Sequence, residues 1–180
     1  MEGPLASLTL SGRRTQQPGK VVSTRHQQAL LFRSVFARLP SGVTVITTAD
    51  PDSTPHGMTI SAVCSLSLDP LLLVACINSN SGTLARILHN GRFAVNILGE
   101  RQGEISMHFA TPGINRFADV AHHRVDGMPV LDDALAWLTC RVTSKNPGGD
   151  HTIVVGETTA MHCNDGEPLV WHDGRYRALT

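Results

Sequence analysis

A histidine at the exit of a glycine-rich turn is the first residue whose position favours chemistry. His151 follows Asn-Pro-Gly-Gly-Asp at 146–150 and precedes the apolar run 152–156, a pattern typical of a hairpin turn that leads into a buried strand. The carboxylate of Asp150 can orient the imidazole, which can then contact a flat ligand or help to move a proton. A solvent-exposed turn histidine without such a role explains the same segment.

A polar run from Asn78 to Thr83 separates an apolar strand-like segment from a short helical one. The start of a helix exposes unpaired backbone N–H groups and the positive end of the helix dipole, and Ser and Thr hydroxyls add further donors. This combination suits a phosphate. The alternative is an ordinary helix cap, in which Ser79 or Ser81 only satisfies the helix.

Small hydroxyl side chains recur between His56 and Pro70. In one regular strand they would share a face, because they stand at odd positions. A face of this kind cannot build a dry core, so it meets water or lines a polar pocket for a flat ligand rich in acceptors. The residues are Thr59, Ser61, Ser65 and Ser67.

Several common catalytic motifs are missing from the sequence. There is no GxGxxG for a Rossmann dinucleotide site, no GxxxxGK[ST] and no GxSxG nucleophile elbow. The nine histidines show no HExxH or similar spacing, and His122-His123 is interpreted as a surface pair. No metal site is therefore expected.

The remaining segments must position these side chains. Residues 1–23 are expected to be a disordered tail and 24–180 a single domain. Helices are expected at 25–39, 82–89 and 101–110, and 111–130 is expected to be irregular. The strand 71–78 is apolar on both faces, which predicts a central, covered strand. Other strands are expected at 42–48, 56–67, 92–98, 136–144, 151–162, 168–171 and 175–179. This order predicts a mainly β antiparallel barrel with flanking α-helices.

Composition restricts the class of partner. Fifteen basic and fifteen acidic residues cancel, so charge gives no reason to expect nucleic acid or membrane binding. Four cysteines lie in apolar segments without a CxxC spacing, which predicts reduced, structural thiols and a cytoplasmic protein. The N-terminus has no hydrophobic signal region, so secretion is not expected.

The motifs together resemble the short flavin reductases that serve as small components of two-component flavin-dependent monooxygenases. The resemblance runs in family order over residues 30–179. The matching stretches begin with Phe32-Arg33, 40–48, 57–61 and 65–70, and continue through 78–83, 93–98, 108–110, Arg116-Phe117, 149–151, 168–171 and 174–176. One departure is that Asp69-Pro70 is followed by Leu71 where the family often has a second proline.

The resemblance implies an FMN-binding split β-barrel, usually a homodimer with the flavin near the subunit interface. Members oxidise NADH or NADPH and release reduced FMN or FAD to a separate oxygenase. Thr59, Ser61, Ser65 and the backbone at Ala62 would contact the isoalloxazine and ribityl chain. The residues expected to hold phosphate are Asn78, Ser79, Ser81 and Thr83. Phe109 would pack on the flavin or the nicotinamide, and His151 would lie beside the nicotinamide as the catalytic residue.

The mechanism implied needs geometry more than acid–base catalysis, because nicotinamide C4 must approach flavin N5 to roughly 3–3.5 Å. Few cationic groups appear among the expected site residues, which predicts a site of neutral donors that releases its flavin. NADH is favoured over NADPH because no arginine cluster marks a 2′-phosphate site. Two rival functions remain: a non-catalytic flavin- or haem-binding barrel module, and a barrel oxidase that acts on an organic substrate in the same site.

Overall fold

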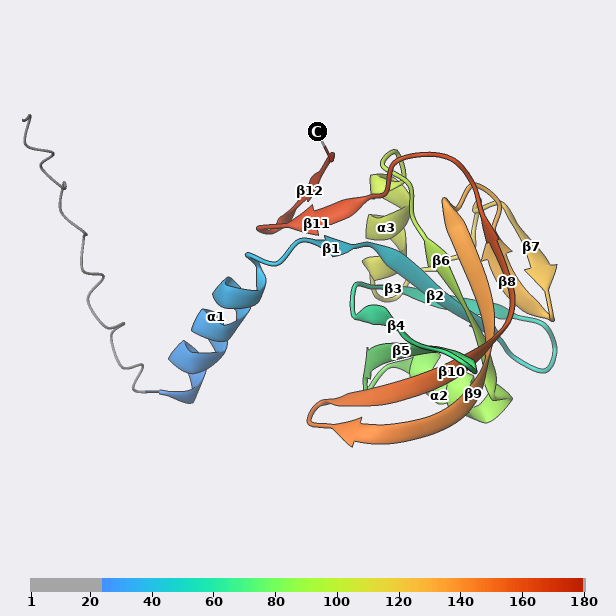
Figure 1. Cartoon of the computed structure of the whole chain (residues 1–180), viewed down its shortest axis with the longest axis horizontal. Helices are drawn as coiled ribbons and strands as arrows, with labels where there is room; N and C mark the ends of the chain where they lie inside the picture. Colours follow the sequence, from blue (N-terminus) through green and yellow to red (C-terminus); the bar gives the residue numbers. More distant parts are fainter. Residues whose placement is uncertain (1–23, 180) are drawn as a thin grey trace, which may run out of the picture.

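The computed structural model describes residues 24–179, and the expected tail 1–23 lies outside them. Within this range a seven-stranded sheet forms the body (Figure 1). All its neighbouring strands are antiparallel. In spatial order they are β3 (Pro55–Ile60), β2 (Thr44–Ala49), β6 (Arg92–Ile97), β9 (Ala136–Gly148), β10 (His151–Cys163), β5 (Leu71–Asn78) and β4 (Val63–Leu68).

The sheet curls into a barrel because of a two-residue link. β3 and β4 are the two edges of the sheet, yet only Ser61 and Ala62 separate them along the chain. A link of this length spans at most about 11 Å, three Cα–Cα steps. The edges must therefore lie close together without pairing, which is the arrangement of a split barrel. The expected mainly β barrel is confirmed.

Close packing inside the barrel depends on a glycine. The ring of Phe93 is fully buried and packs with Ile46, Val95 and Val154 in the main apolar cluster. A Cβ added at Gly156 would stand 2.5 Å from Cζ of Phe93. Any larger residue at this position would displace the ring, since a packed core has no spare volume.

Two helices cover the body and a third stands apart from it. α2 (Gly82–Asn90) begins at the Ser81 cap and ends at Gly91, whose φ of 69° gives a left-handed helix end. α3 (Gly103–Ala110) lies near the other end of the barrel (Figure 1). α1 (Arg25–Phe36) projects away from the body and buries none of its residues. The predicted helix is therefore confirmed, although it ends at Phe36 and not at residue 39, and its apolar stripe is uncovered.

Two smaller sheets complete the fold. β1 (Ser41–Gly42) pairs with β11 (Val170–His172), which pairs with β12 (Arg175–Arg177). β7 (His122–Val125) and β8 (Met128–Leu131) form a hairpin. Over residues 24–179 no helix is long and apolar enough to cross a membrane.

The structure corrects three sequence predictions. The segment 56–67 is two strands, because the chain breaks at Ser61-Ala62. Residues 111–130 are not wholly irregular: Asp126 and Gly127 have φ of 52° and 80°, as a tight hairpin turn requires. β5 is the second strand from an edge, and only one of its faces is buried, so it is not a central strand covered on both sides.

Candidate functional site

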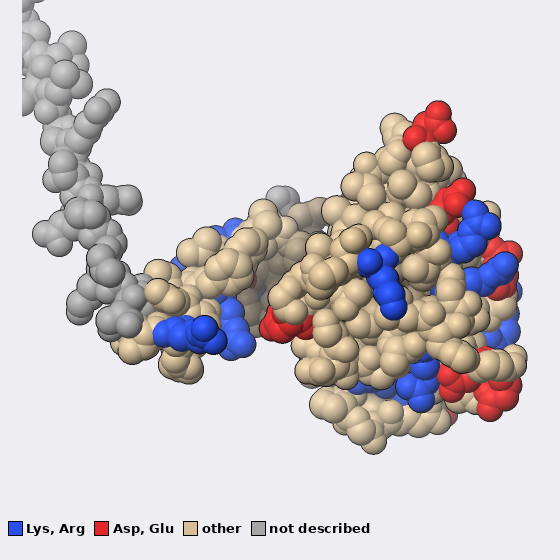
Figure 2. Space-filling model, turned by 90° about the horizontal axis from the view of Figure 1, so that it is seen from below, with Lys and Arg blue, Asp and Glu red and all other residues tan. Residues whose placement is uncertain are grey.

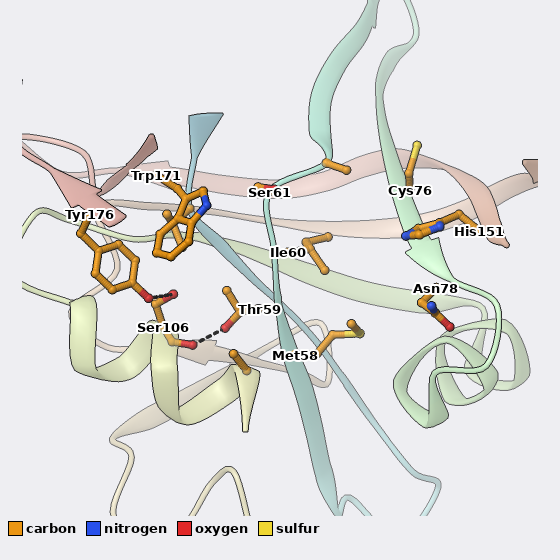
Figure 3. Close-up of a pocket in the computed structure, with 13 residues that line it drawn as sticks. Met58, Thr59, Ile60, Ser61, Cys76, Asn78, Ser106, His151, Trp171 and Tyr176 are labelled. Carbon is orange, nitrogen blue, oxygen red and sulfur yellow. Dashed lines mark hydrogen bonds between the residues drawn. The ribbon is translucent and has the colours of Figure 1, made fainter. Parts of the chain in front are cut away.

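A cavity of about 380 Å³ opens beside the split between β3 and β4 (Figure 3). Strands β3, β5 and β10, helix α3 and the β11–β12 pair all contribute to it. Its lining residues are Val43, Met58, Thr59, Ile60, Ser61, Ala62, Cys76, Asn78, Ser106, Ala110, His151, Trp171 and Tyr176. The cavity thus gathers segments more than 100 residues apart in the sequence.

One wall of the cavity is aromatic. Trp171 and Tyr176 face each other across β11 and β12, with ring centroids 5.0 Å apart and planes at 70°. The Tyr176 hydroxyl donates to Oγ of Ser106 at 2.8 Å. The Thr59 hydroxyl donates to the Ser106 carbonyl at 2.6 Å. These bonds fix the wall and the floor of the cavity to α3, and Trp171 remains 39% exposed.

The opposite wall holds the histidine. His151 pairs with Asn78 across β10 and β5, and Figure 3 shows both side chains across the cavity from the indole. Nδ1 of His151 lies 2.8 Å from Oδ1 of Asp150, which confirms the predicted pairing.

This pairing also fixes which ring nitrogen is free. The hydrogen bond from His151 lowers the pKa of Asp150 below its ordinary value, so the carboxylate is ionised near neutral pH and can only accept. Nδ1 therefore carries the proton, and Nε2 is left available to a ligand.

A second hollow, which we name the phosphate groove after the sequence prediction for its helix start, adjoins the cavity. It has a volume of about 1030 Å³ and shares Met58 and Asn78 with the cavity. The start of α2 lies along it. The Ser81 hydroxyl accepts from the backbone N–H groups of Thr83 and Leu84, so Ser81 is the helix cap that the sequence left as an alternative. The dipole of α2 points its positive end into the groove.

Two arginines also line this groove. Arg116 Nη1 donates to the Gly57 carbonyl at 2.8 Å and its Nε donates to the Thr111 carbonyl at 3.1 Å. Arg86 Nη1 donates to the carbonyl of Gly82 at 3.1 Å. These contacts hold two positive charges beside the helix start, so the region expected to bind phosphate is not lined by neutral donors alone.

An ion-pair cluster holds Arg86 in place. Oδ2 of Asp50 lies 2.7 Å from Nε2 of His56, and Nε of Arg86 lies 3.3 Å from Oδ1. The hydrogen bond from His56, with help from Arg86, lowers the pKa of Asp50. The carboxylate thus remains charged and keeps the guanidinium on the groove side of α2.

The structure sorts the predicted site residues into separate places. Those that line the cavity are Thr59, Ser61, Ala62, Asn78 and His151, and those that line the phosphate groove are Asn78, Ser81 and Thr83. Ser79 lines neither, because its Oγ pairs with Oγ1 of Thr152 at 3.1 Å. Thr83 is 6% exposed, and its hydroxyl is directed to the Gly57 carbonyl at 3.5 Å.

Ser65 does not join the cavity. It lines a third, apolar groove together with Ser67. The predicted common face holds only in part: Ser61, Ser65 and Ser67 line this groove, whereas Thr59 lines the cavity. The break at Ser61-Ala62 separates the two sets, because it changes which side of the sheet the following side chains occupy.

Phe109 does not line the cavity. Its ring is 0% exposed and packs edge-on against Phe117 at 5.1 Å. A Cβ at Gly57 would lie 2.9 Å from Cε1 of Phe109. The ring therefore supports β3 from behind, and it is not among the residues that line the cavity, where the expected stacking on a flavin or nicotinamide would place it.

Sequence reasoning missed Trp171, Tyr176 and Ser106 as cavity residues and both arginines. One usable signal was present for Arg86, which stands four residues after Gly82 and so shares the face of the helix start. Arg116 belongs to a long loop without periodicity, and no local pattern directs it to Gly57.

Comparisons with known proteins match this chain to one family. Residues 36–180 match the flavin reductase like domain. The reductase component of a 4-nitrophenol 4-monooxygenase/4-nitrocatechol 2-monooxygenase from Rhodococcus opacus is 47% identical over 81% of this chain and 78% of its own. A flavin reductase (NADH) from Kitasatospora aureofaciens is 45% identical over 72% and 69%.

The fold agrees with solved structures as well. The NADH:FAD oxidoreductase SgcE6 of Streptomyces globisporus, in complex with NAD and FAD fragments, superposes with a TM-score of 0.83. The two are 30% identical, and the match covers 90% of this chain and 98% of that one.

Proposed function

The chain belongs to the flavin reductase family, and on this premise we propose how its cavity and phosphate groove carry out flavin reduction. The protein is an NAD(P)H-dependent flavin oxidoreductase that reduces FAD or FMN and supplies the reduced flavin to a partner monooxygenase. The observation that carries the proposed mechanism is the junction of the two hollows at Met58 and Asn78. One hollow suits a flat ring, and the other suits its phosphate.

The residues present fit a flavin. A cavity of 380 Å³ with one aromatic wall and a hydroxyl-bearing floor is of the size and character that ring-shaped ligands occupy. The phosphate is assigned to the start of α2, where Arg116 and Arg86 add charge-assisted donors. The groove is larger than one phosphate requires, and it has two cations. Both features favour FAD over FMN.

Each side chain has a separate task. A bound flavin would supply the acceptor for the hydride of the nicotinamide. Thr59 and Ser61 position the ring from the floor, and backbone groups at Ala62 meet its edge. His151 would offer Nε2 to the nicotinamide and help to orient it. Trp171 closes the cavity on the far side and limits access of water.

Two further properties are proposed. We infer a homodimer, supported by the uncovered apolar face of α1. We also infer a cytoplasmic location, supported by the four unpaired thiols of Cys64, Cys76, Cys140 and Cys163.

The test is a steady-state assay that crosses NADH and NADPH with FAD, FMN and riboflavin. We expect oxidation of NADH that depends on added flavin, with a lower KM for FAD than for FMN. Riboflavin, which has no phosphate, should have the highest KM. A purified protein that binds flavin but consumes no nicotinamide nucleotide would be a non-catalytic flavin module. Equal KM values for FAD and riboflavin would remove the role of the phosphate groove.

A further inference from the structure

The phosphate groove has a direction, which β3 defines. Met58 lines both the cavity and the groove, whereas Gly57, His56 and Pro55 line the groove alone. A strand advances by about 3.3 Å per residue, so Pro55 lies roughly 10 Å farther from the cavity than Met58. The groove therefore has one end next to the cavity and one end far from it.

Three successive residues of β3 meet different polar groups along this direction. The Ser81 hydroxyl donates to Sδ of Met58 at 3.1 Å. The Gly57 carbonyl accepts from Nη1 of Arg116 at 2.8 Å. His56 is linked through a carboxylate to the second arginine of the groove. The two arginines thus occupy consecutive positions along β3, and the second lies farther from the cavity.

Arg86, the second arginine, is fixed from two sides. Its Nη1 donates to the Gly82 carbonyl at 3.1 Å, and its Nε lies 3.3 Å from Oδ1 of Asp50. The other carboxylate oxygen of Asp50 lies 2.7 Å from Nε2 of His56. Within residues 24–179 no hydrogen bond engages Nη2 of Arg86, so this end of the guanidinium is available to a ligand.

The anchor of Arg86 is itself held in place. The Asp50 N–H donates to the Thr54 carbonyl at 2.9 Å, and the Thr54 N–H donates to Oδ1 of Asp52 at 2.9 Å. These bonds close the turn between β2 and β3. Asp50 does not line the groove, whereas Arg86 does, so the guanidinium lies between the carboxylate and the groove. A side chain held in this way loses less conformational freedom when it binds a ligand.

An ordinary surface ion pair is the alternative explanation. Acidic and basic side chains lie next to one another at several places on the body (Figure 2), and exposed pairs contribute little to stability. One example is Arg141, whose Nη2 lies 2.7 Å from Oε2 of Glu157. Arg86 differs from it because its carboxylate has a second partner in His56 and because both His56 and Arg86 line the groove.

We propose that Arg86 binds the second phosphate of FAD, which FMN lacks, and that Asp50 is its positioning residue. This inference rests on the proposed function, in which the start of α2 and Arg116 bind the phosphate that both flavins share. The two phosphates of FAD are joined through one oxygen atom, so their spacing is comparable to the rise of one strand residue, about 3.3 Å. The consecutive positions of Arg116 and Arg86 along β3 fit this spacing. Arg86 is therefore a specificity-determining residue for FAD.

The first experiment is a titration of the purified protein with FAD, FMN and riboflavin, followed by flavin fluorescence. Arg86→Ala should raise the Kd of FAD about tenfold, through the loss of one charge-assisted hydrogen bond, and change the Kd of FMN by less than about twofold. An unchanged Kd of riboflavin shows that the variant keeps an intact cavity. The matched control is Arg141→Ala, which removes an arginine from the same kind of pair outside the groove and should leave all three Kd values unchanged.

Two results would overturn the role of Arg86. An equal rise in the Kd of FAD and of FMN would place Arg86 at the phosphate that both flavins share. Unchanged Kd values for both flavins would mean that Arg86 and Asp50 form an ordinary surface ion pair.

Asp50→Asn tests the positioning role, because asparagine keeps the size of the side chain and removes its charge. The KM for FAD should rise about threefold with kcat within about twofold, and the KM for FMN should be unchanged. In Asp50→Asn/Arg86→Ala the KM for FAD should equal that of Arg86→Ala alone, since a residue that acts through Arg86 has no effect without it. Additive effects, or a lower KM for FAD in Asp50→Asn, would overturn the positioning role.

Binding and catalysis can fail separately in these experiments. The titrations do not need turnover, so a protein with the expected FAD-selective loss that oxidises no NADH or NADPH would refute the proposed function alone. A protein that reduces flavin, but whose Arg86→Ala variant binds FAD as tightly as the wild type does, would refute the role of Arg86 alone.

Discussion

The cavity and the phosphate groove meet at Met58 and Asn78 but are built from different chemistry. The cavity is lined by neutral hydroxyls, aromatic rings and one histidine, and its hydroxyls at Thr59 and Tyr176 are already hydrogen-bonded. The groove has a helix start, two arginines and an ion-pair cluster. The difference indicates that binding and reaction depend on different parts of the protein. Charged groups in the groove bind the phosphate, and the shape of the cavity positions the ring.

The largest effect is expected from a negative charge at the helix start. Ser81→Asp keeps a good N-cap, so the free energy of unfolding in urea should change by less than about 0.5 kcal/mol. The carboxylate should nevertheless repel the phosphate and raise the Kd of FAD by about 100-fold, from roughly 3 kcal/mol of repulsion at short range. Ser81→Asn is the uncharged control. Equal loss of FAD binding in both variants would contradict the electrostatic account.

Removal of a groove arginine should have a smaller effect. Arg116→Ala should raise the Kd of FAD and FMN by about 30-fold, the loss of one charged hydrogen bond of roughly 2 kcal/mol. Riboflavin titrations should be unchanged because riboflavin has no phosphate. Arg101→Ala, at a 93% exposed side chain outside the groove, is the control. A matching loss for riboflavin would show that Arg116 only supports Gly57 and the loop.

A substitution in the cavity should affect the use of NADH and not the binding of flavin. His151→Ala should raise the KM for NADH about tenfold, roughly 1.4 kcal/mol, and leave the Kd of FAD within twofold. His123→Ala is a matched control, because His123 makes the same kind of pair with Asp132 at 2.7 Å outside the cavity. If the Kd of FAD rises as much as the KM for NADH, the cavity and the phosphate groove do not serve different substrates.

The smallest effect is expected from substitution of Asp150, the partner of His151. The Asp150 carboxylate is 88% exposed, and exposed pairs contribute little. Asp150→Asn should raise the KM for NADH about two- to threefold by loosening the imidazole.

The pH dependence of this pair follows from the lowered pKa of Asp150. The carboxylate favours the fold above its ordinary pKa, and this contribution is lost only as pH falls through the lowered value. The difference between Asp150→Asn and wild type in KM should therefore be constant from pH 8 to pH 6. A difference that vanishes at pH 6 would contradict the pairing.

Local patterns predicted most of the elements. The strand at 71–78 and the helices at 82–89 and 101–110 were predicted within one or two residues, because periodicity and turn residues are local properties. The hairpin β7–β8 was missed although Asp126-Gly127 is a usual hairpin turn. Its strands are four residues each, too short for a clear alternation.

The site was only partly predictable. His151 beside Asp150 and the polar helix start are set by adjacent residues. Ser65 was misplaced because one broken strand reverses the alternation of side chains beyond it. Phe109 was misplaced because its burial depends on the residues that lie across the barrel. The local spacing of residues does not predict those contacts.

The sequence by itself determined the barrel strands, the helix cap at Ser81, the histidine turn and the family motifs in their order. Only the tertiary structure decided that Trp171 faces His151, that Arg86 and Arg116 charge the phosphate groove, and that α1 buries none of its residues within the described chain. Strand pairing and loop closure join residues far apart along the chain, and packing settles which of their faces meet. A local pattern specifies an element but not its neighbours.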